Sequence, residues 1–412
     1  MSAPTGVTYV ALLRSPGARP AFAGATLVRL NYATLSLALL FTVQRATGSF
    51  AVAGAALGAC ALPSVLAPYK SRLVDRHGVP RMLSLLGAGY SVALLLLAML
   101  AVADITRAAP YLVLAGMAGA LTPPVGPIMR GIWATLTPNP ADRNRAYSLD
   151  AVAEESLFAA GPLIVGAVVL VAEPVAALVL TAVLAASGSA ALARSPLARR
   201  RPQIAPAARS PQRLLGPLLL PGVRWVLVVM LGVGFALAPL ELAVAAAASE
   251  SGHPAAAGYL LALLSLASAA GGLAWGRLRH RQRQSSQLLA LLLLLATGTA
   301  AAGFATSLPA LAVALALTGL FVAPAYVVAY VLADELVDAH VRTETSTWVA
   351  TASNLGGAAG AVTAGLLIEH SSARAAFLLG GLALLALTPI LAAQRHHRPV
   401  DSPLPRPPAA VR

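Results

Sequence analysis

The sequence has few charged residues, few aromatic residues and a single cysteine. Only 11% of the 412 residues are charged and 5% are aromatic, while 58% are hydrophobic and the mean hydropathy is +0.77. So few charges cannot cover the surface of a water-soluble protein of this length. A lipid bilayer removes that requirement, because residues that face lipid should be apolar. The composition therefore predicts a membrane protein.

Several kinds of site are missing as well. The lone Cys60 excludes a disulfide framework and a cysteine-based metal site. The sequence has no Gly-x-x-x-x-Gly-Lys-Ser/Thr phosphate loop and no His-Glu-x-x-His zinc sequence, and none of its histidines lies in the middle of an apolar run. We therefore expect no metal, no cofactor and no enzymatic activity.

The net charge of +14 does not indicate a nucleic-acid-binding protein, because the basic residues lie in short loops between long apolar runs. Almost all of them are arginine, and alanine is abundant. This bias predicts a bacterial protein from a GC-rich genome.

Twelve apolar runs are long enough to cross a bilayer, which takes about 20 helical residues. They lie at residues 21–43, 51–69, 82–103, 110–129, 147–172, 174–193, 223–247, 255–276, 287–307, 309–332, 345–368 and 374–393. The first run lacks a signal-peptide cleavage site, so we expect it to remain in the protein as the first span.

The loops between these runs predict the orientation in the membrane. If the N-terminus is cytoplasmic, the cytoplasmic loops hold nearly all of the Arg and Lys residues, and the opposite loops hold only Arg45, Arg107 and Arg374. Positive residues concentrate on the cytoplasmic side of membrane proteins. The predicted fold is therefore an all-α, multi-pass protein of the bacterial inner membrane with both termini in the cytoplasm.

The second half of the chain repeats landmarks of the first. Residues 47–54 align with 251–258, Ser71 aligns with Gly276, and the Gly119…Pro124 spacing recurs at Gly319…Pro324. We predict two pseudo-symmetric six-helix bundles, 1–193 and 222–412, joined by a basic, proline-rich linker at 194–221. Repeats of this kind in transporters place the substrate site between the halves.

The loop after the second run carries a recognisable motif. Residues 71–81 read Ser-Arg-Leu-Val-Asp-Arg-His-Gly-Val-Pro-Arg. Asp75, Arg76, Gly78 and Arg81 resemble the Gly-x-x-x-Asp-Arg-x-Gly-x-x-Arg signature of the major facilitator superfamily, with serine in place of the first glycine. The resemblance covers nearly the whole chain and implies a secondary transporter in which this loop latches the cytoplasmic side through partners such as Glu344. An ordinary solvated basic loop is the alternative.

Glycines in two spans suggest close packing and a direction of transport. Gly161, Pro162 and Gly166 are similar to the Gly-Pro-x-x-Gly-Gly motif of exporters in the same family, with one glycine missing, which favours export over import. Proline bends a helix and glycine allows a neighbour to approach. Gly356 and Gly360, four residues apart, predict tight helix packing in the eleventh span, unless they only reflect the high glycine content.

Charges inside the first and fifth spans are candidate substrate or proton-coupling groups. Arg29 shares a helix stripe with Tyr32 and should face protein or water, unless its side chain extends to the headgroups. Glu154 or Glu155 can pair with Arg29 or exchange protons. The alternative is that these acids, together with Asp150, only favour a helix N-terminus.

The second half offers three more candidates. Glu241 lies deep in the seventh span with no cation nearby in sequence, where it can bind a cationic group or carry a proton. If the span ends early, Glu241 lies among the outer headgroups instead. Tyr326 and Tyr330, one turn apart, can offer hydroxyls and aromatic faces to a ligand or form an interfacial belt.

These features predict a monomeric secondary transporter that moves a small organic molecule by alternating access, most simply by proton-coupled export driven by the proton gradient. An importer or uniporter of a small solute is the alternative within the same family. A membrane sensor or scaffold without transport activity is the alternative from another class. The expected partners are the substrate and the lipid bilayer.

Overall fold

The computed structural model describes residues 9–137, 140–200, 220–277, 282–337 and 342–394, and omits some side chains within these ranges, among them Asp75, Glu155 and Glu344. The described part is helical throughout. The first half contains α1 (Tyr9–Arg14), α2 (Ala18–Thr47), α3 (Phe50–Ala61), the 3-10 helix η1 (Leu62–Leu66), α4 (Ala67–His77), α5 (Val79–Val102), α6 (Ala108–Leu121), α7 (Val125–Leu136), α8 (Pro140–Val171), α9 (Pro174–Arg194) and α10 (Pro196–Arg200). The second half contains α12 (Pro221–Glu250), α13 (Ala256–Arg277), α14 (Gln284–Ala302), α15 (Leu308–Glu335), α16 (Arg342–His370) and α17 (Ala373–Gln394).

Every predicted span coincides with helical structure, and the all-α membrane fold is confirmed. Within the described ranges, ten helices are long and apolar enough to cross a membrane, and Phe50–Leu66 and Ala373–Pro389 are apolar but shorter. The count of twelve spans and the cytoplasmic placement of both termini stay predictions. The linker residues 201–219 lie outside the described part of the chain.

Three spans differ in detail from the prediction. The helix expected at 147–172 already begins at Pro140. The span expected at 51–69 is divided into α3, η1 and α4, with a proline near the start of both η1 and α4. The span expected at 110–129 is broken between Leu121 and Val125. Pro123 and Pro124 account for this break, because proline lacks the N–H that continues a helix.

Large apolar side chains are exposed along the outer helices. Val171 is 83% exposed, Val102 70%, Leu170 66% and Met99 65%. Water would disfavour so much exposed apolar surface, whereas the hydrocarbon interior of a bilayer favours it. The exposure agrees with a multi-pass membrane protein.

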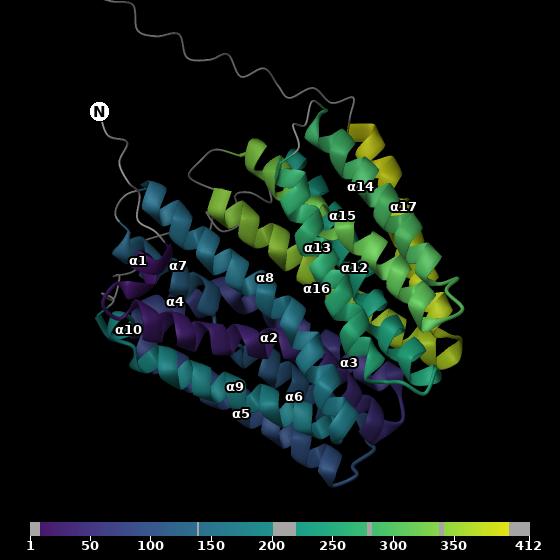
Figure 1. Ribbon diagram of the computed structural model, residues 1–412, viewed down its shortest axis with the longest axis horizontal. Coiled ribbons are helices and arrows are strands. Elements are labelled where there is room, and N and C mark those ends of the chain that lie inside the picture. The colour runs from purple at the N-terminus through teal and green to yellow at the C-terminus, as the bar shows by residue number, and fades with distance from the viewer. Residues whose placement is uncertain (1–8, 138–139, 201–219, 278–281, 338–341, 395–412) are drawn as a thin grey trace, which may run out of the picture.

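The helices form two bundles that meet at one end and diverge toward the other (Figure 1). In the first bundle, α2 packs on α8 and α9, and α5 packs on α6 and α9. In the second, α12 packs on α16 and α17, and α15 packs on α13 and α14. Two helix pairs form most of the contact between the bundles: α3 with α16, and α8 with α13.

The buried apolar side chains show where the bundles meet. One cluster contains residues of both halves, such as Leu40 and Leu94 with Val244 and Phe377. The other two clusters each belong to one half, one around Met230 in the second half and the other around residues 125–133 in the first. The bundles therefore share a core at one end, here called the shared end. They have separate cores at the other, here called the terminal end because α2 begins and α17 ends there.

Glycines bring the bundles into close contact at the shared end. A Cβ on Gly54 of α3 would collide with the carbonyl oxygen of Ala361 in α16. A Cβ on Gly166 of α8 would lie 2.9 Å from the carbonyl oxygen of Ala255 and 3.1 Å from the Cα of Gly258 in α13. Small residues allow this approach where no hydrophobic effect drives helices together.

The other predicted packing glycines act within a bundle. Gly161 lies against the backbone of Ala33 in α2, and Gly356 and Gly360 lie against the backbone of α12. Pro162 lies inside α8, one residue after Gly161. Gly166 therefore contacts the partner bundle, whereas Gly161, Gly356 and Gly360 hold neighbours of the same bundle together.

Candidate functional site

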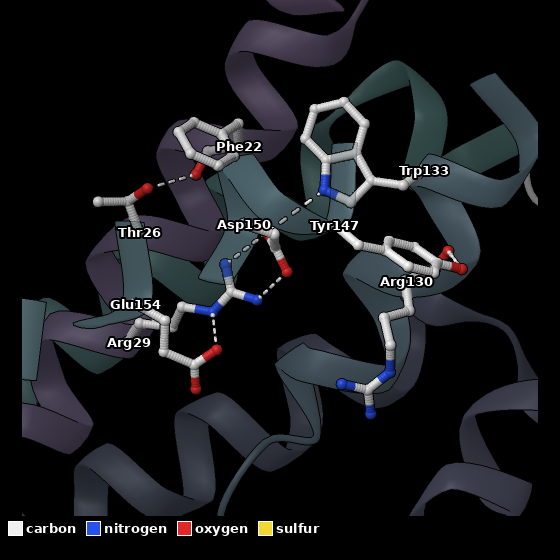
Figure 2. Close-up of polar contacts among 8 residues, drawn as sticks. All are labelled: Phe22, Thr26, Arg29, Arg130, Trp133, Tyr147, Asp150 and Glu154. Atoms are coloured by element: carbon white, nitrogen blue, oxygen red, sulfur yellow. Dashed lines mark hydrogen bonds and ion pairs between the residues drawn. The ribbon is translucent and has the colours of Figure 1, made fainter. Parts of the chain in front are cut away.

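A buried, bidentate ion pair joins α2 to α8. The Arg29 guanidinium donates to both carboxylate oxygens of Asp150, with Nη1–Oδ1 at 2.7 Å and Nη2–Oδ2 at 2.5 Å (Figure 2). Both side chains are buried, 2% and 9% exposed. A bidentate, charge-assisted pair of this kind fixes both side chains and keeps a buried guanidinium neutralised.

Two further side chains complete this cluster, which we call the Arg29 cluster: Arg29, Asp150, Glu154 and Trp133. Glu154 lies one turn after Asp150, and its Oε2 is 3.5 Å from Arg29 Nε. Trp133 of α7 donates from Nε1 to Asp150 Oδ1 at 3.3 Å. The Glu154 side chain remains 43% exposed. Because Asp150 already neutralises Arg29, Glu154 is left as the accessible carboxylate of the cluster.

Two sequence-based interpretations change here. The Arg29 side chain does not extend outward from the bundle, since Asp150 holds it inside. Asp150 does not lie at a helix N-terminus, because α8 begins at Pro140. The expected contact between Arg29 and Glu154 is present, but Asp150 is the principal partner. The Glu155 side chain lies outside the described part of the structure.

Tyr32 connects this cluster to the broken span. It lies one turn after Arg29 in α2, and its hydroxyl donates to the carbonyl oxygen of Pro123, between α6 and α7. Arg130 of α7 is exposed, and in Figure 2 its guanidinium points away from the Arg29–Asp150 pair. The Tyr32 hydroxyl therefore already has a partner within the first bundle.

Glu241 lies at the boundary between two cores. It is exposed, although its neighbours Leu240 and Leu242 are each 1% exposed and belong to the shared core. Five residues earlier, Ala236 belongs to the core of the second bundle alone. Glu241 also lies close enough to Tyr326 of α15 to interact with it electrostatically. The carboxylate is therefore accessible within α12, at the depth where the two bundles begin to separate.

Tyr326 and Tyr330 are both half-buried at the edge of the second bundle's core. The Tyr326 hydroxyl and Ser353 Oγ are 2.7 Å apart, which joins α15 to α16. Tyr326 therefore joins two helices, and it interacts electrostatically with Glu241.

The motif at residues 71–81 forms the end of α4 and the start of α5. Arg76 and Arg81 are exposed. Gly78 joins the two helices with φ 87° and ψ 145°, a backbone conformation that residues other than glycine rarely adopt. The predicted contacts of Asp75 and Glu344 fall on side chains outside the described part of the structure.

Sequence reasoning missed two groups of this region. Asp150 lies four residues before Glu154, so both occupy one helix face, and this spacing was a usable signal. Lys70 is buried beside the break between α6 and α7, and its Nζ donates to the carbonyl oxygens of Gly119 and Thr122. Its only sequence signal is that no other lysine occurs in the chain.

A sequence profile described as Major Facilitator Superfamily matches residues 21–281 and 234–411, and so covers nearly the whole chain. The chain belongs to the Major Facilitator Superfamily. This membership gives it the role of a small-solute transporter rather than an enzyme. No curated protein sequence matches it.

Solved structures of transporters share this superfamily fold. The nucleoside transporter NupG is similar with a TM-score of 0.76 at 10% identity, over 92% of this chain and 99% of that one. A bacterial homologue of the iron transporter ferroportin in an inward-facing state gives 0.68 at 13% identity, over 90% and 98%. The human organic anion transporter MFSD10 (TETRAN) gives 0.60 at 20% identity, over 90% and 98%. At these identities the likeness concerns the fold alone.

Proposed function

We propose that this superfamily member is a secondary active transporter of the bacterial inner membrane that exports a small organic molecule in exchange for protons. It acts as a monomer of two six-helix halves, residues 1–193 and 222–412, with both termini in the cytoplasm. The observation that carries the proposal is Glu241, an accessible carboxylate within an apolar span, at the depth where the shared core gives way to two separate ones.

The arrangement of the cores supports alternating access. Under the proposed orientation the terminal end is cytoplasmic, so the structure corresponds to a state closed toward the outside by the contacts of α3 with α16 and of α8 with α13. Transport requires the reverse state, in which these contacts open and the terminal end closes. The loop at Asp75, Arg76, Gly78 and Arg81 then latches the terminal end.

The charges support a different function for each half, one in proton transfer and the other in substrate binding. In the first half, Asp150 neutralises Arg29 and leaves Glu154 accessible. In the second half, Glu241 interacts electrostatically with Tyr326. A charged group inside a membrane is costly unless it faces water or a partner, and such groups mark substrate and proton pathways. Glu241 carries the proton or binds the substrate. Glu154 is the candidate for whichever of these two functions Glu241 does not perform.

The test compares substrate accumulation by Glu241→Gln and by the wild type in inside-out membrane vesicles across which a pH gradient is imposed. The probes are fluorescent small molecules that the wild type accumulates, and their accumulation is measured with and without an uncoupler. We expect Glu241→Gln to lose gradient-driven accumulation while it reaches the membrane at normal levels. Glu250→Gln is the matched control, because Glu250 is an exposed residue at the end of the same helix.

Each outcome separates the proposal from its rivals. Unchanged accumulation by Glu241→Gln removes Glu241 from the coupling mechanism. Wild-type accumulation that persists with the uncoupler indicates a carrier without proton coupling. Transport only in the opposite direction, measured in right-side-out vesicles, indicates an importer.

A further inference from the structure

Lys70 is the single lysine of the chain, which otherwise uses arginine for its strongly basic residues. It lies in α4 and is 6% exposed. Among the described residues no carboxylate forms an ion pair with it. A buried ammonium group must find other acceptors, because burial without partners costs several kcal/mol.

Those acceptors come from the break between α6 and α7. In a continuous helix the N–H of residue 123 would donate to the carbonyl oxygen of Gly119, but Pro123 has no N–H. Thr122 follows the last residue of α6, where carbonyl groups also lack helical donors. The break therefore leaves the carbonyl oxygen of Gly119 with only a long backbone bond, 3.4 Å from the N of Thr122, and among the described residues no backbone N–H donates to that of Thr122.

Lys70 provides donors to this end of α6. Its Nζ lies 3.3 Å from the carbonyl oxygen of Gly119 and 3.1 Å from that of Thr122. The hydroxyl of Tyr32 donates to the next carbonyl, that of Pro123. A positive charge at this place also interacts favourably with the dipole at the C-terminus of α6.

The surroundings explain why the residue is lysine rather than arginine. A Cβ on Gly119 would collide with the carbonyl oxygen of Cys60, so α3 and α6 are in backbone contact beside the site. An ammonium is a compact point charge with three donors in different directions, whereas a guanidinium is a wide planar fork. Two converging carbonyl oxygens in a narrow space suit the ammonium.

The second half of the protein lacks this arrangement. The residue aligned with Lys70 is Trp275, and α15 continues without a break across Pro324. The buried cation and the broken helix therefore occur together in the first half, and neither occurs at the aligned, described positions of the second half.

We propose that the Lys70 ammonium is a tethered cation that occupies the carbonyl-lined break of the α6–α7 span. In transporters with discontinuous helices, carbonyl groups at such breaks bind a mobile cation such as Na⁺. Here the protein supplies the cation from its own side chain, so no Na⁺ is needed at the break. The proposal does not depend on which substrate is moved or in which direction.

The first experiment measures the accessibility of the wild-type amine. The full-length protein in detergent is treated with an acetylating reagent, and acetylation of Lys70 is followed by mass spectrometry. Arg107→Lys provides the reference, because residue 107 is exposed at the shared end and then carries a second lysine in the same molecule. We expect the acetylation rate of Lys70 to be lower than that of the lysine at position 107 by a factor of about ten or more, since reaction at Lys70 requires local opening. Equal rates would show that the amine is free and overturn the proposal.

The second experiment replaces the tethered cation by a soluble one. The melting temperature of the purified Lys70→Ala protein is measured at constant ionic strength in chloride salts of methylammonium and tetramethylammonium. Methylammonium reproduces the tip of the lysine side chain, whereas tetramethylammonium has no N–H donors. We expect Lys70→Ala to melt below the wild type and to regain much of the difference in methylammonium only. Equal melting temperatures in the two salts would overturn the proposal.

Lys70→Arg tests whether the site requires the shape of an ammonium group, and it replaces Lys70→Ala as the test if that variant does not fold. It keeps the charge but changes the shape of the donor, and we expect it to melt clearly below the wild type. A Lys70→Arg protein as stable as the wild type would show that the site does not require an ammonium. For the wild type, we expect the same melting temperature in sodium and choline chloride, and a rise specific to Na⁺ would contradict a site already filled by Lys70.

Discussion

Replacing Asp150 with asparagine removes the charge that neutralises Arg29 and leaves the side chain almost the same size. The pair is bidentate, with contacts of 2.7 and 2.5 Å, and both partners are buried. Removing one partner of a buried pair costs about 3–5 kcal/mol, because the other charge stays buried without compensation. Glu154 lies 3.5 Å from Arg29 Nε but is 43% exposed, so it compensates only in part. We expect Asp150→Asn to lower the free energy of unfolding by about 3 kcal/mol.

The assay is reversible unfolding in mixed micelles, followed by circular dichroism and tryptophan fluorescence as the denaturing component increases. The double variant Arg29→Met/Asp150→Leu removes both charges and should recover most of the loss, since an apolar pair avoids the cost of burying ions. Glu173→Gln is the control. It removes the Arg45–Glu173 pair, in which both side chains are about two-thirds exposed and no measurable change is expected.

If Asp150→Asn has a free energy of unfolding within about 1 kcal/mol of the wild type, the range of an exposed pair, then Asp150 does not neutralise a buried charge. The same conclusion follows if the double variant is as unstable as the single one. That result would mean that Asp150 matters for its shape or for its bond with Trp133 rather than for the charge of Arg29.

Three further substitutions probe the packing and the contact between halves. Gly360→Ala places a Cβ against the carbonyl oxygen of Phe235 and should lower the free energy of unfolding by about 1–3 kcal/mol, whereas Gly116→Ala, with 3.7 Å of clearance, should not. Gly78→Ala forces alanine into a conformation with φ 87° and should cost about 1–3 kcal/mol in the same assay. Glu369→Ala removes the acceptor, at the end of α16, of hydrogen bonds from the side chain of Ser49 and the backbone N–H of residue 51. Pulsed EPR distances across the shared end should then broaden toward longer values, and an unchanged distribution would show that this contact does not hold the halves together.

Much of the fold could be predicted because a bilayer restricts what a chain can do. Each apolar run of the right length must form a helix, since lipid offers no partner to backbone groups, so the runs and the helices coincide. The breaks were less predictable from apolar runs alone. Hydropathy does not register Pro123 and Pro124, although their missing N–H groups divide the span.

The sequence by itself determined that this protein is an all-α membrane protein and that Arg29, Glu154 and Glu241 are charges within apolar runs, and it predicted that the two halves repeat. Only the tertiary structure decided which of these charges remain accessible. Asp150 and Glu154 share one face of α8, and the way α2 packs on α8 selects Asp150 as the close partner of Arg29. Lys70 likewise meets its carbonyl acceptors only because α4 folds back beside a break that begins about fifty residues later in the chain. Apolar length is a local property of the sequence, whereas the neutralisation of a buried charge depends on which distant segment packs beside it.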